Sequence, residues 1–590
     1  MAFGRRPSTD FGTAALHAAL LAAFCVLAAT GLRIASDDPE AMWLSVFDPV
    51  LPMEDLWYRH LVAGMVLTGA LAAYALYVVG AHLGARMRFD RARLSMIRRH
   101  GRGRYAALNI AVVWVLVASL TVEIVSGVLV FGGAGQGALA LHRRAAWVCM
   151  ACIAAHVALH AVYGGLPQIL RIFNPKRLRN GGPPPDLADL LAEQLRRRSK
   201  PDAEEAVEHH RTKTESLHAH PLATALLVAL LLLGVACGSE TLTRPVLFIA
   251  AVDPAQAPRI DGDLSDPVWT RSTAVSVMTT QGGDFGGTHQ SQVEIRAVHD
   301  REFAYFAFVW EDPTRSLKHH PLVKREDGWR VAATRADLGD EHVYNEDKFA
   351  VLLSASALPL IGGAIHLAHF PLVGKPAASS ARGLHYTTDG NIVDVWQWRA
   401  SHEGPAGHVD NCHFGGPSES ASDDEVRQYN GGFAVDPGPA IYESNFIVTA
   451  QGAARPVQPR RLPKNLLAMA RAMGRVSEAT NESESENARW WMSESESLPY
   501  SPEADAAIPV GTVIPGILMR EEVTPRRNDV RGFGRWASGR WTLEVMRRLR
   551  TDSIYDVEIE SGSLMWVAAF DHSEKRHSRH LRPLRLELER

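Results

Sequence analysis

The stretch HRRAAWVCMACIAAHVALH covers residues 142–160 and decides the architecture of the first part of the chain. Its apolar run, residues 144–163, is long enough to cross a bilayer, since the hydrocarbon layer requires about 20 helical residues. His142 and His156 are 14 residues apart, which in a helix is about 21 Å along the axis on nearly the same face. One helix therefore offers two imidazoles at two depths. Ionisable groups are costly inside a membrane, so each is a candidate for function.

Three apolar stretches before this one and one after it are also of spanning length. A membrane helix needs at least about 17 residues, a limit that the first three pass easily and the last meets narrowly. They cover residues 12–32, 61–84, 107–131 and 221–237. The first is too long for the apolar part of a cleaved signal peptide, and further spans follow it. The sequence predicts a four-helix transmembrane bundle plus one extra transmembrane helix.

The chain has 590 residues, too many for one ordinary domain. The stretch LLLGVACGSE around Cys237 is only weakly similar to a lipoprotein cleavage site, so the fifth helix is interpreted as a plain tether. The predicted units are a membrane domain at 1–175, a cytoplasmic linker at 176–219, the fifth helix at 220–238, and a β-sandwich at 245–590 with a disordered acidic insertion at about 475–498.

Loop charges predict how the chain crosses the membrane. The loop at 85–104 carries eight arginines against Asp90, whereas the loop at 33–59 carries six acidic residues against two arginines. Positively charged loops stay on the cytoplasmic side. We therefore expect a cytoplasmic N-terminus in a bacterial inner membrane. Everything after about residue 240 is then periplasmic.

Two more histidines match the depths of His142 and His156. His17 lies near the inner end of the first predicted span, and His60 lies at the outer end of the second. Haem iron with two axial histidines suits such an arrangement, because bundle cores commonly hold cofactors between facing helices. The alternative is that these are interfacial or packing histidines. Glu123, inside the third span, is either a proton relay or the partner of a neighbouring hydroxyl group.

The motifs HAALLAAFCVLAATGL, YRHLVAG and HRRAAWVCMACIAAHVALH resemble the di-haem cytochrome b subunits of nickel-iron hydrogenases and formate dehydrogenases. The resemblance implies two b-type haems, an inner one held by His17 and His156 and an outer one held by His60 and His142. It also implies a quinone beside the inner haem. His160, one turn from His156, is either an alternative axial ligand or a neighbour of that quinone.

The second half of the chain changes from continuous apolar runs to alternation, which indicates strands. Loops rich in glycine, proline and aspartate separate these segments, and a β-sandwich is expected. The predicted strands are QVEIRAVHD, FAYFAFVWED, DKFAVLLS, GRWTLEVMRRL, LMWVAAFDH and LRPLRLELE.

The motifs IDGDLSDPVW, EFAYFAFVWEDPT, NEDKFAVLL and DVWQWRA occur in order and resemble the haem-binding domain of ethylbenzene dehydrogenase-like proteins. The resemblance implies one b-type haem, which a methionine and a lysine ligate in the best-known members. DVWQWRA instead carries Arg399, and arginine stays protonated and cannot bind iron. Our preferred ligand pair is His366 with His577, with His572 as the alternate at the second position. Further histidines left open as ligands are His369, His385, His413 and His580.

Composition and missing motifs limit the function further. The formal net charge is −3, which argues against nucleic acid as the main partner. Only five cysteines occur, and four of them lie in apolar runs, which excludes a disulfide framework. The absence of a Cys-x-x-Cys-His motif excludes covalent haem attachment. Neither half carries a catalytic signature. We expect a membrane-bound b-type cytochrome that carries electrons between the quinone pool and a periplasmic redox partner. Its own enzymatic activity is uncertain, and an electron-transfer subunit is favoured.

Two alternatives belong to other classes. In one, the sandwich binds a sugar or small ligand and the helices anchor it, with an aromatic platform made of Trp269, Trp310, Trp396 and Trp398. In the other, the chain reduces external metal directly.

Overall fold

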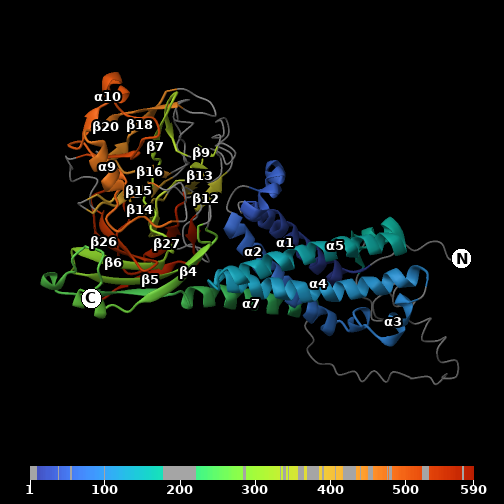
Figure 1. Ribbon diagram of the computed structural model, residues 1–590. Coiled ribbons are helices and arrows are strands. Elements are labelled where there is room, and N and C mark those ends of the chain that lie inside the picture. Colours follow the sequence, from blue (N-terminus) through green and yellow to red (C-terminus); the bar gives the residue numbers. More distant parts are fainter. Residues whose placement is uncertain are drawn as a thin grey trace, which may run out of the picture.

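The computed structural model describes the chain apart from residues 1–8, 37–38, 53–55, 99, 174, 177–220, 283–286, 333, 336–340, 343, 356–364, 369–383, 388–390, 405–406, 416–432, 439, 450–455, 475, 477–481, 521–529 and 574–576. It consists of a helical part followed by a β domain (Figure 1). Nearly all of the predicted linker at 176–219 lies outside the described residues.

Five helices of the described chain are long and apolar enough to cross a membrane, as predicted. They are α1 (Phe11–Ala35), α2 (Leu56–Gly80), α4 (Arg102–Phe131), α5 (Gln136–Ile169) and α7 (Pro221–Leu242). The α3 helix (Arg91–Ile97) lies in the arginine-rich loop, and the 3-10 segment η1 (Pro39–Val50) lies in the acidic loop. All five helices are longer than the corresponding apolar runs, because flanking residues extend one or both of their ends.

The long helices pack as neighbours, α1 with α2 and α4 with α5. Asp10 fixes the end of α1: its carboxylate accepts from the Thr13 backbone N–H at 2.8 Å and from the Tyr77 hydroxyl at 2.6 Å. Arg86 donates to the other oxygen at 2.8 Å. The α1 helix is therefore tied to α2 and to the arginine-rich loop at one end of the bundle.

The α7 helix packs on the bundle. Ala225 and Ala229 of α7 share a buried cluster with residues of α1 and α2. Gly69 of α2 lies under Leu233, where a β-carbon would stand 3.3 Å from the leucine. This contact was not predictable from apolarity, which is the same for a lipid-facing helix and for a packed one.

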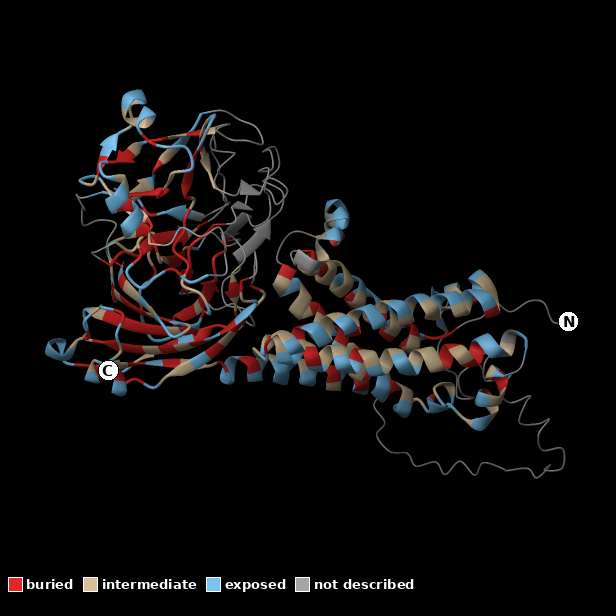
Figure 2. Ribbon diagram, in the orientation of Figure 1, coloured by how far each residue is buried: buried red, intermediate tan, exposed pale blue. Residues whose placement is uncertain are grey.

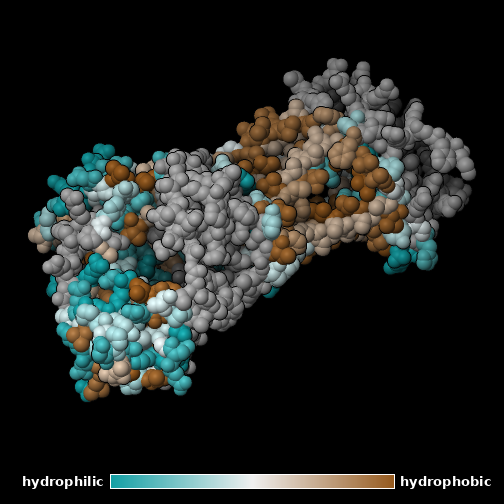
Figure 3. Space-filling view, turned by 90° about the horizontal axis from the view of Figure 1, so that it is seen from above, coloured by the Kyte–Doolittle hydropathy of each residue, from teal (hydrophilic) through white to brown (hydrophobic). Residues whose placement is uncertain are grey.

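The outer faces of the helices are apolar and exposed, as a lipid-facing surface requires. Leu230 and Leu231 of α7 are 66% and 61% exposed. Figure 3 shows hydrophobic residues gathered over the helical part, whereas the described surface of the β domain is largely hydrophilic. In Figure 2, buried residues concentrate in the strands of the β domain.

The β domain is built on one large, mostly antiparallel sheet with thirteen described strands. Along its main path the strands are β16 (Phe433–Val435), β15 (Asp410–Phe414), β14 (Val393–Arg399), β11 (Lys348–Ser354), β27 (Leu564–Phe570), β28 (Ser578–Arg579), β4 (Val275–Thr280), β5 (Gln290–His299), β6 (Phe303–Glu311), β26 (Arg540–Arg548) and β25 (Val530–Ala537). Off this path, β3 (Val246–Ala251) runs parallel to both β5 and β29 (Leu584–Leu588). The predicted strands are confirmed.

Smaller sheets and helices complete this domain. A five-stranded sheet contains β18 (Phe446–Val448), β19 (Pro456–Pro459), β8 (Gly328–Val331), β7 (Leu322–Arg325) and β23 (Val513–Ile514). A three-stranded sheet contains β17 (Tyr442–Ser444), β24 (Ile517–Met519) and β21 (Trp491–Ser493). Short pairs are β12 (Ile365–Ala368) with β13 (Leu384–Thr387), and β20 (Arg461–Pro463) with β22 (Ser497–Pro499). The helices here are α9 (Leu466–Met473) and α10 (Pro502–Ala506).

The two halves of the large sheet face each other across an aromatic core, as in a sandwich. Phe306 of β6 lies 5.6 Å from Trp396 of β14, measured between ring centroids. Phe308 and Trp310, also of β6, lie 4.8 and 4.6 Å from Phe349 of β11. Buried aromatic pairs contribute about 0.5–1.5 kcal/mol each beyond their area. Alternation in the sequence placed these side chains on one face of each strand.

The tryptophans considered for a binding platform belong to the interior. Trp269 is 3% exposed, and Trp310, Trp396 and Trp398 are each 1% exposed. They therefore form no exposed surface on which a sugar ring stacks.

The prediction that the acidic insertion at about 475–498 is disordered is wrong for the described residues 482–498, because this segment packs onto the domain. Trp490 is 1% exposed, and its indole N–H donates to Glu484 at 3.2 Å. Glu484 also pairs with Lys318 at 3.0 Å. This stretch is rich in serine and glutamate, but the buried indole of Trp490 holds the segment in place.

The β domain contacts the bundle at the end where α5 begins (Figure 1). The Gln136 backbone N–H donates to the side chain of Gln290 at 2.9 Å, and its amide donates to the His289 carbonyl at 3.0 Å. Arg582 donates to the Glu240 carbonyl, at the end of α7, at 2.8 Å. The bundle end that carries His60 and His142 is thus the end that meets the β domain.

His580 makes the stability of the β domain depend on pH. Its Nε2 accepts from the Val567 N–H at 3.0 Å, and its Nδ1 donates to the Arg582 carbonyl at 2.7 Å. Burial lowers the pKa of His580 from 6.5 to about 4. The folded state therefore binds a proton at His580 more weakly than the unfolded state does. The contribution of His580 to the free energy of unfolding is fully present above about pH 6.5 and is lost as the pH falls towards 4.

We expect the free energy of unfolding to fall by about 2 kcal/mol between pH 7 and pH 5 through His580 alone. Urea unfolding of the full chain, followed by tryptophan fluorescence at both pH values, measures this difference. The variant His580→Gln removes the titrating group and should show a smaller drop. Equal drops in both proteins would contradict the assignment.

Candidate functional sites

The four predicted membrane histidines form two facing pairs. His17 of α1 and His156 of α5 have ring centroids 6.4 Å apart. His60 of α2 and His142 of α5 have centroids 6.2 Å apart. The fourteen-residue spacing on α5 thus offers one imidazole to α1 and another to α2 at two depths.

The separation within each pair fits an iron ion between the two rings. An imidazole nitrogen binds a transition metal at about 2 Å, and the ring centroid lies about 1 Å beyond it, so two axial rings have centroids about 6 Å apart. Both observed distances agree with this value. In addition, Nδ1 of His156 is buried without a hydrogen bond to any residue that the structure describes. The residues present therefore fit two bis-histidine haem sites.

The rings of the outer pair are oriented by hydroxyl groups. The Thr30 hydroxyl donates to the Val26 carbonyl at 2.7 Å, so its contact of 2.9 Å with His60 Nδ1 requires the proton on that nitrogen. Nδ1 of His142 lies 3.1 Å from both the Ser126 hydroxyl and the Glu123 carbonyl. Both rings then carry the proton on Nδ1, which leaves the lone pair of each Nε2 for a metal.

Two glycines make room for the outer pair. A β-carbon on Gly31 of α1 would lie 3.3 Å from Cε1 of His60, and one on Gly127 of α4 would lie 3.2 Å from Cε1 of His142. The carboxylate of Glu123 lies 3.3 Å from Nε2 of His142. The Glu123 side chain therefore contacts a predicted ligand, whereas the Ser126 hydroxyl donates to the Glu123 backbone carbonyl at 3.1 Å and not to this carboxylate.

His160 occupies a different environment from His156. Its Nδ1 lies 2.7 Å from the Tyr163 hydroxyl, and its Nε2 lies 3.2 Å from the Asn109 side chain. Its ring stands 4.6 Å from that of His156 at an angle of 81°. Both nitrogens of His160 are engaged by polar partners, so the geometry favours His156 as the residue that faces His17.

The predicted ligands of the β domain are only partly described. His366 and His385 lie on β12 and β13, but their side chains are outside the described residues, as is all of His369. His577 is half-buried with its ring 4.7 Å from that of Phe570. The alternate, His572, is buried and pairs through Nδ1 with Asp571 at 2.6 Å.

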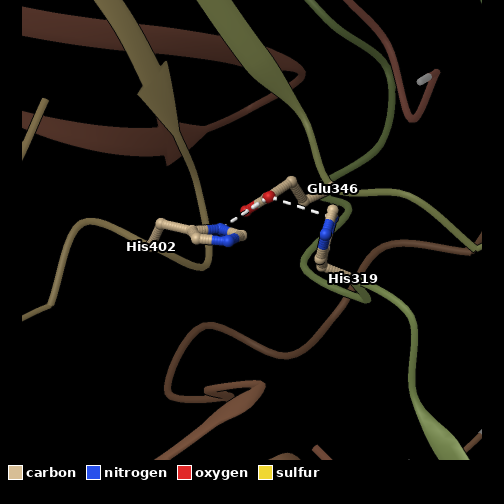
Figure 4. A group of neighbouring side chains, drawn as sticks. All are labelled: His319, Glu346 and His402. Carbon is tan, nitrogen blue, oxygen red and sulfur yellow. Dashed lines mark ion pairs between the residues drawn. The ribbon is translucent and has the colours of Figure 1, made fainter. Parts of the chain in front are cut away.

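A cluster of donors that the sequence did not suggest lies inside the β domain (Figure 4). Oε1 of Glu346 lies 3.3 Å from Nδ1 of His319 and 2.7 Å from Nδ1 of His402. The side chain of Glu346 is 0% exposed, that of His319 is 10% exposed and that of His402 is 2% exposed. His319 stands before β7, Glu346 directly before β11, and His402 just after β14.

The register of the sheet explains why these three residues meet. Lys348 at the start of β11 pairs with Arg399 at the end of β14, so the loops beside them share one edge. Ser316 then locks the third loop in place: its N–H donates to the Asp347 carboxylate at 2.7 Å, and its carbonyl accepts from the Asp347 N–H at 2.9 Å. The only signal in the sequence was the presence of adjacent polar residues in the segments KHHP, NEDK and SHEG.

The protonation states of this cluster follow from its surroundings. Burial lowers the pKa of His319 well below its usual value and lowers that of His402 as well. Burial alone would raise the pKa of Glu346, but His402 and Arg399 hold it below its usual range. The cluster thus combines two neutral imidazoles with one carboxylate, which is the state that a metal ion requires.

A second group, Asp347 with Asp571 and His572, has a structural role. The Asp347 carboxylate accepts from the N–H groups of Ser316 and His572 at 2.7 and 3.0 Å and from the Trp541 indole at 3.0 Å. These donors occupy both oxygens. The group therefore ties three segments of the β domain together.

Comparison with known proteins finds two families. Residues 266–582 match the family model described as ethylbenzene dehydrogenase, and residues 8–175 match that described as prokaryotic cytochrome b561. Both resemblances seen in the sequence are confirmed. No curated protein matches the chain.

Solved structures similar to the chain include two carbohydrate-binding proteins. One is a family 9 carbohydrate-binding module from Caldicellulosiruptor kristjanssonii in complex with glucose, at 8% identity and a TM-score of 0.20, covering 58% of this chain and 95% of that one. The other is a putative carbohydrate-binding protein from Bacteroides uniformis, at 8% identity and a TM-score of 0.23, covering 59% and 100%.

Proposed function

Because the chain belongs to the ethylbenzene dehydrogenase family and begins with a membrane b-type cytochrome domain, we propose that it carries electrons between the quinone pool and a periplasmic redox partner. The observation that carries this proposal is the pair of facing histidine sites at two depths of one bundle. One end of the proposed electron-transfer path is the pair His17 and His156, at the end of the bundle away from the β domain. The other end is beside the β domain.

We propose His17 with His156 and His60 with His142 as the axial ligands of two b-type haems. Bound there, haem supplies a one-electron carrier whose potential depends on its ligands and their hydrogen bonds. The chain's own contribution is orientation. Thr30 and Ser126 fix the ring orientation of the outer pair, and the glycines at 31 and 127 allow close approach.

The position of the outer pair supports transfer to the β domain. Gln136, which hydrogen-bonds to Gln290 and His289, is six residues before His142, or about 9 Å along α5. An electron at the outer pair is therefore close to the contact between the two parts. We propose that His366 and His577, with His572 as the alternate at the second position, would hold one further b-type haem in the β domain, which would supply a third one-electron carrier.

The proposed direction of insertion follows from the loop charges. The N-terminus and the arginine-rich loop with α3 are cytoplasmic, and the β domain is periplasmic, in a bacterial inner membrane. We place quinone near the inner pair, where His17 and His160 lie. The catalytic chemistry of the respiratory complex is assigned to a separate periplasmic partner.

Haem stoichiometry and quinol reduction of the purified full chain test this proposal. The pyridine haemochrome assay should give three b-type haems per chain, and a quinol should reduce them. A result of two haems per chain together with quinol reduction would contradict the proposed haem of the β domain but support electron transfer through the membrane helices. Absence of quinol reduction would overturn the proposal and favour a ligand-binding module on a membrane anchor.

A further inference from the structure

We propose that His319, Glu346 and His402 bind a first-row divalent transition-metal ion that is separate from any haem of the protein. The cluster lies in the β domain and uses none of the histidines assigned to haem. The proposal does not depend on electron transfer by the membrane helices.

The spacing of the donors suits such an ion. At bond lengths of about 2.1 Å, the ligand atoms of a tetrahedral site lie about 3.4 Å apart. Nδ1 of His319 and Oε1 of Glu346 are already at 3.3 Å. Nδ1 of His402 lies 2.7 Å from the same oxygen, so binding requires this one separation to open by less than 1 Å.

Two of the three donor atoms have no other use in the part of the chain that the structure describes. Nδ1 of His319 and Oε1 of Glu346 are buried, and neither makes a hydrogen bond of acceptable geometry there. Leaving a buried polar atom without such a bond costs about 1–3 kcal/mol. A cation between these atoms would satisfy both at once.

The carboxylate is held in position for this role by its second oxygen. Oε2 of Glu346 accepts from the Ser401 backbone N–H at 2.6 Å and from the Ser401 hydroxyl. Oε1 therefore turns towards the two imidazoles, as Figure 4 shows. Such outer contacts orient the ligands of metal sites and raise their affinity.

The cluster does not have the shape of a haem site. The rings of His319 and His402 have centroids 4.9 Å apart at an angle of 79°. The two membrane pairs, in contrast, have centroids 6.4 and 6.2 Å apart, with space for iron between them.

The donor set indicates the class of metal. Imidazole nitrogen is typical of zinc, iron, copper and nickel sites, whereas magnesium and calcium prefer oxygen alone. Two histidines and one carboxylate leave coordination positions open for water, as in zinc and non-haem iron(II) sites. We therefore expect Zn²⁺ or Fe²⁺ and not an alkaline-earth ion.

Elemental analysis of the purified full chain tests the proposal. We expect about one zinc or one iron in excess of haem iron per chain. X-ray absorption at the zinc edge, after loading with Zn²⁺, should show nitrogen and oxygen neighbours at about 2.0–2.1 Å. This spectrum needs no variant, so it tests the site even where a substitution prevents folding.

The variants His319→Ala and Glu346→Gln should bind the metal with an affinity lower by about tenfold or more, while they keep the haem content of the parent. The matched control is His413→Ala, a buried histidine that pairs with Asp436 at 2.7 Å outside the cluster and should retain the metal. Three results would overturn the proposal: no stoichiometric metal in the parent chain, metal retained in both cluster variants, or loss of haem in place of metal.

Discussion

Replacing His156 with alanine is expected to remove one b-type haem from the membrane domain and to abolish reduction by quinol. The reason is geometric: His17 would face a methyl group in place of an imidazole whose ring centroid is 6.4 Å away. A single axial ligand does not reproduce a bis-histidine site, and the spectrum depends on both ligands. The pyridine haemochrome assay and the reduced-minus-oxidised visible spectrum measure the loss.

The control lies one helical turn away. His160→Ala removes a neighbouring imidazole of the same helix, but its nitrogens contact Tyr163 and Asn109 and do not face His17. This variant should keep its haem content. If His160→Ala loses the haem and His156→Ala keeps it, the ligand assignment is wrong and the alternative ligand is correct.

The outer pair has its own test in the same assay. His142→Ala should also cost one haem, while reduction of the remaining membrane haem by quinol should persist. This difference separates the two depths, because quinone is proposed only at the inner pair. An unchanged spectrum in both His142→Ala and His156→Ala would remove the basis for electron transfer in this chain.

Replacing Arg547 with methionine is expected to lower the free energy of unfolding of the β domain by about 3–5 kcal/mol. The Arg547 side chain is 0% exposed and lies 2.8 Å from Asp394 and 3.2 Å from Asp556. It also donates to the Val557 carbonyl at 2.7 Å. Methionine fills a similar volume but leaves two buried carboxylates without a counter-charge.

The location of Arg547 explains why the effect is large. It belongs to β26, on one half of the large sheet, whereas Asp394 belongs to β14 on the other half. The ion pair therefore joins the two faces across the core. Its guanidinium also lies 5.4 Å from the centroid of the Trp396 ring.

The next residue provides a matched control. Arg548 pairs with Glu302 at 2.6 Å, but its side chain is 51% exposed. Exposed ion pairs contribute at most about 1 kcal/mol. Urea unfolding of the full chain, followed by tryptophan fluorescence, should show a large shift for Arg547→Met and almost none for Arg548→Met. Equal shifts would show that the buried pair has no special role.

Much of the fold was predictable because it follows from local periodicity. Continuous apolar runs predicted the membrane helices, and alternation predicted the strands β5, β6, β11 and β26. The spacing of His142 and His156 was predictable for the same reason, since both lie on one helix. These features depend only on residues that are close in the sequence.

Other features depend on how distant segments pack. The ordered packing of residues 482–498 was missed because many of them are serines and glutamates, and the packing of α7 on α2 was missed because an apolar sequence does not show which helix it contacts. The cluster of His319, Glu346 and His402 could not be found either. Its members come from three loops, and only strand pairing brings them together.

The sequence by itself determined the five membrane helices, the strand pattern and the positions of the histidines along their helices. The tertiary structure alone decided which histidine faces which, and it alone brought two imidazoles and a carboxylate together beside β11 and β14. The physical reason is that periodicity is a property of a single segment. A ligand site, in contrast, requires atoms of several segments to converge within a few ångströms, and only the packing of those segments fixes such distances.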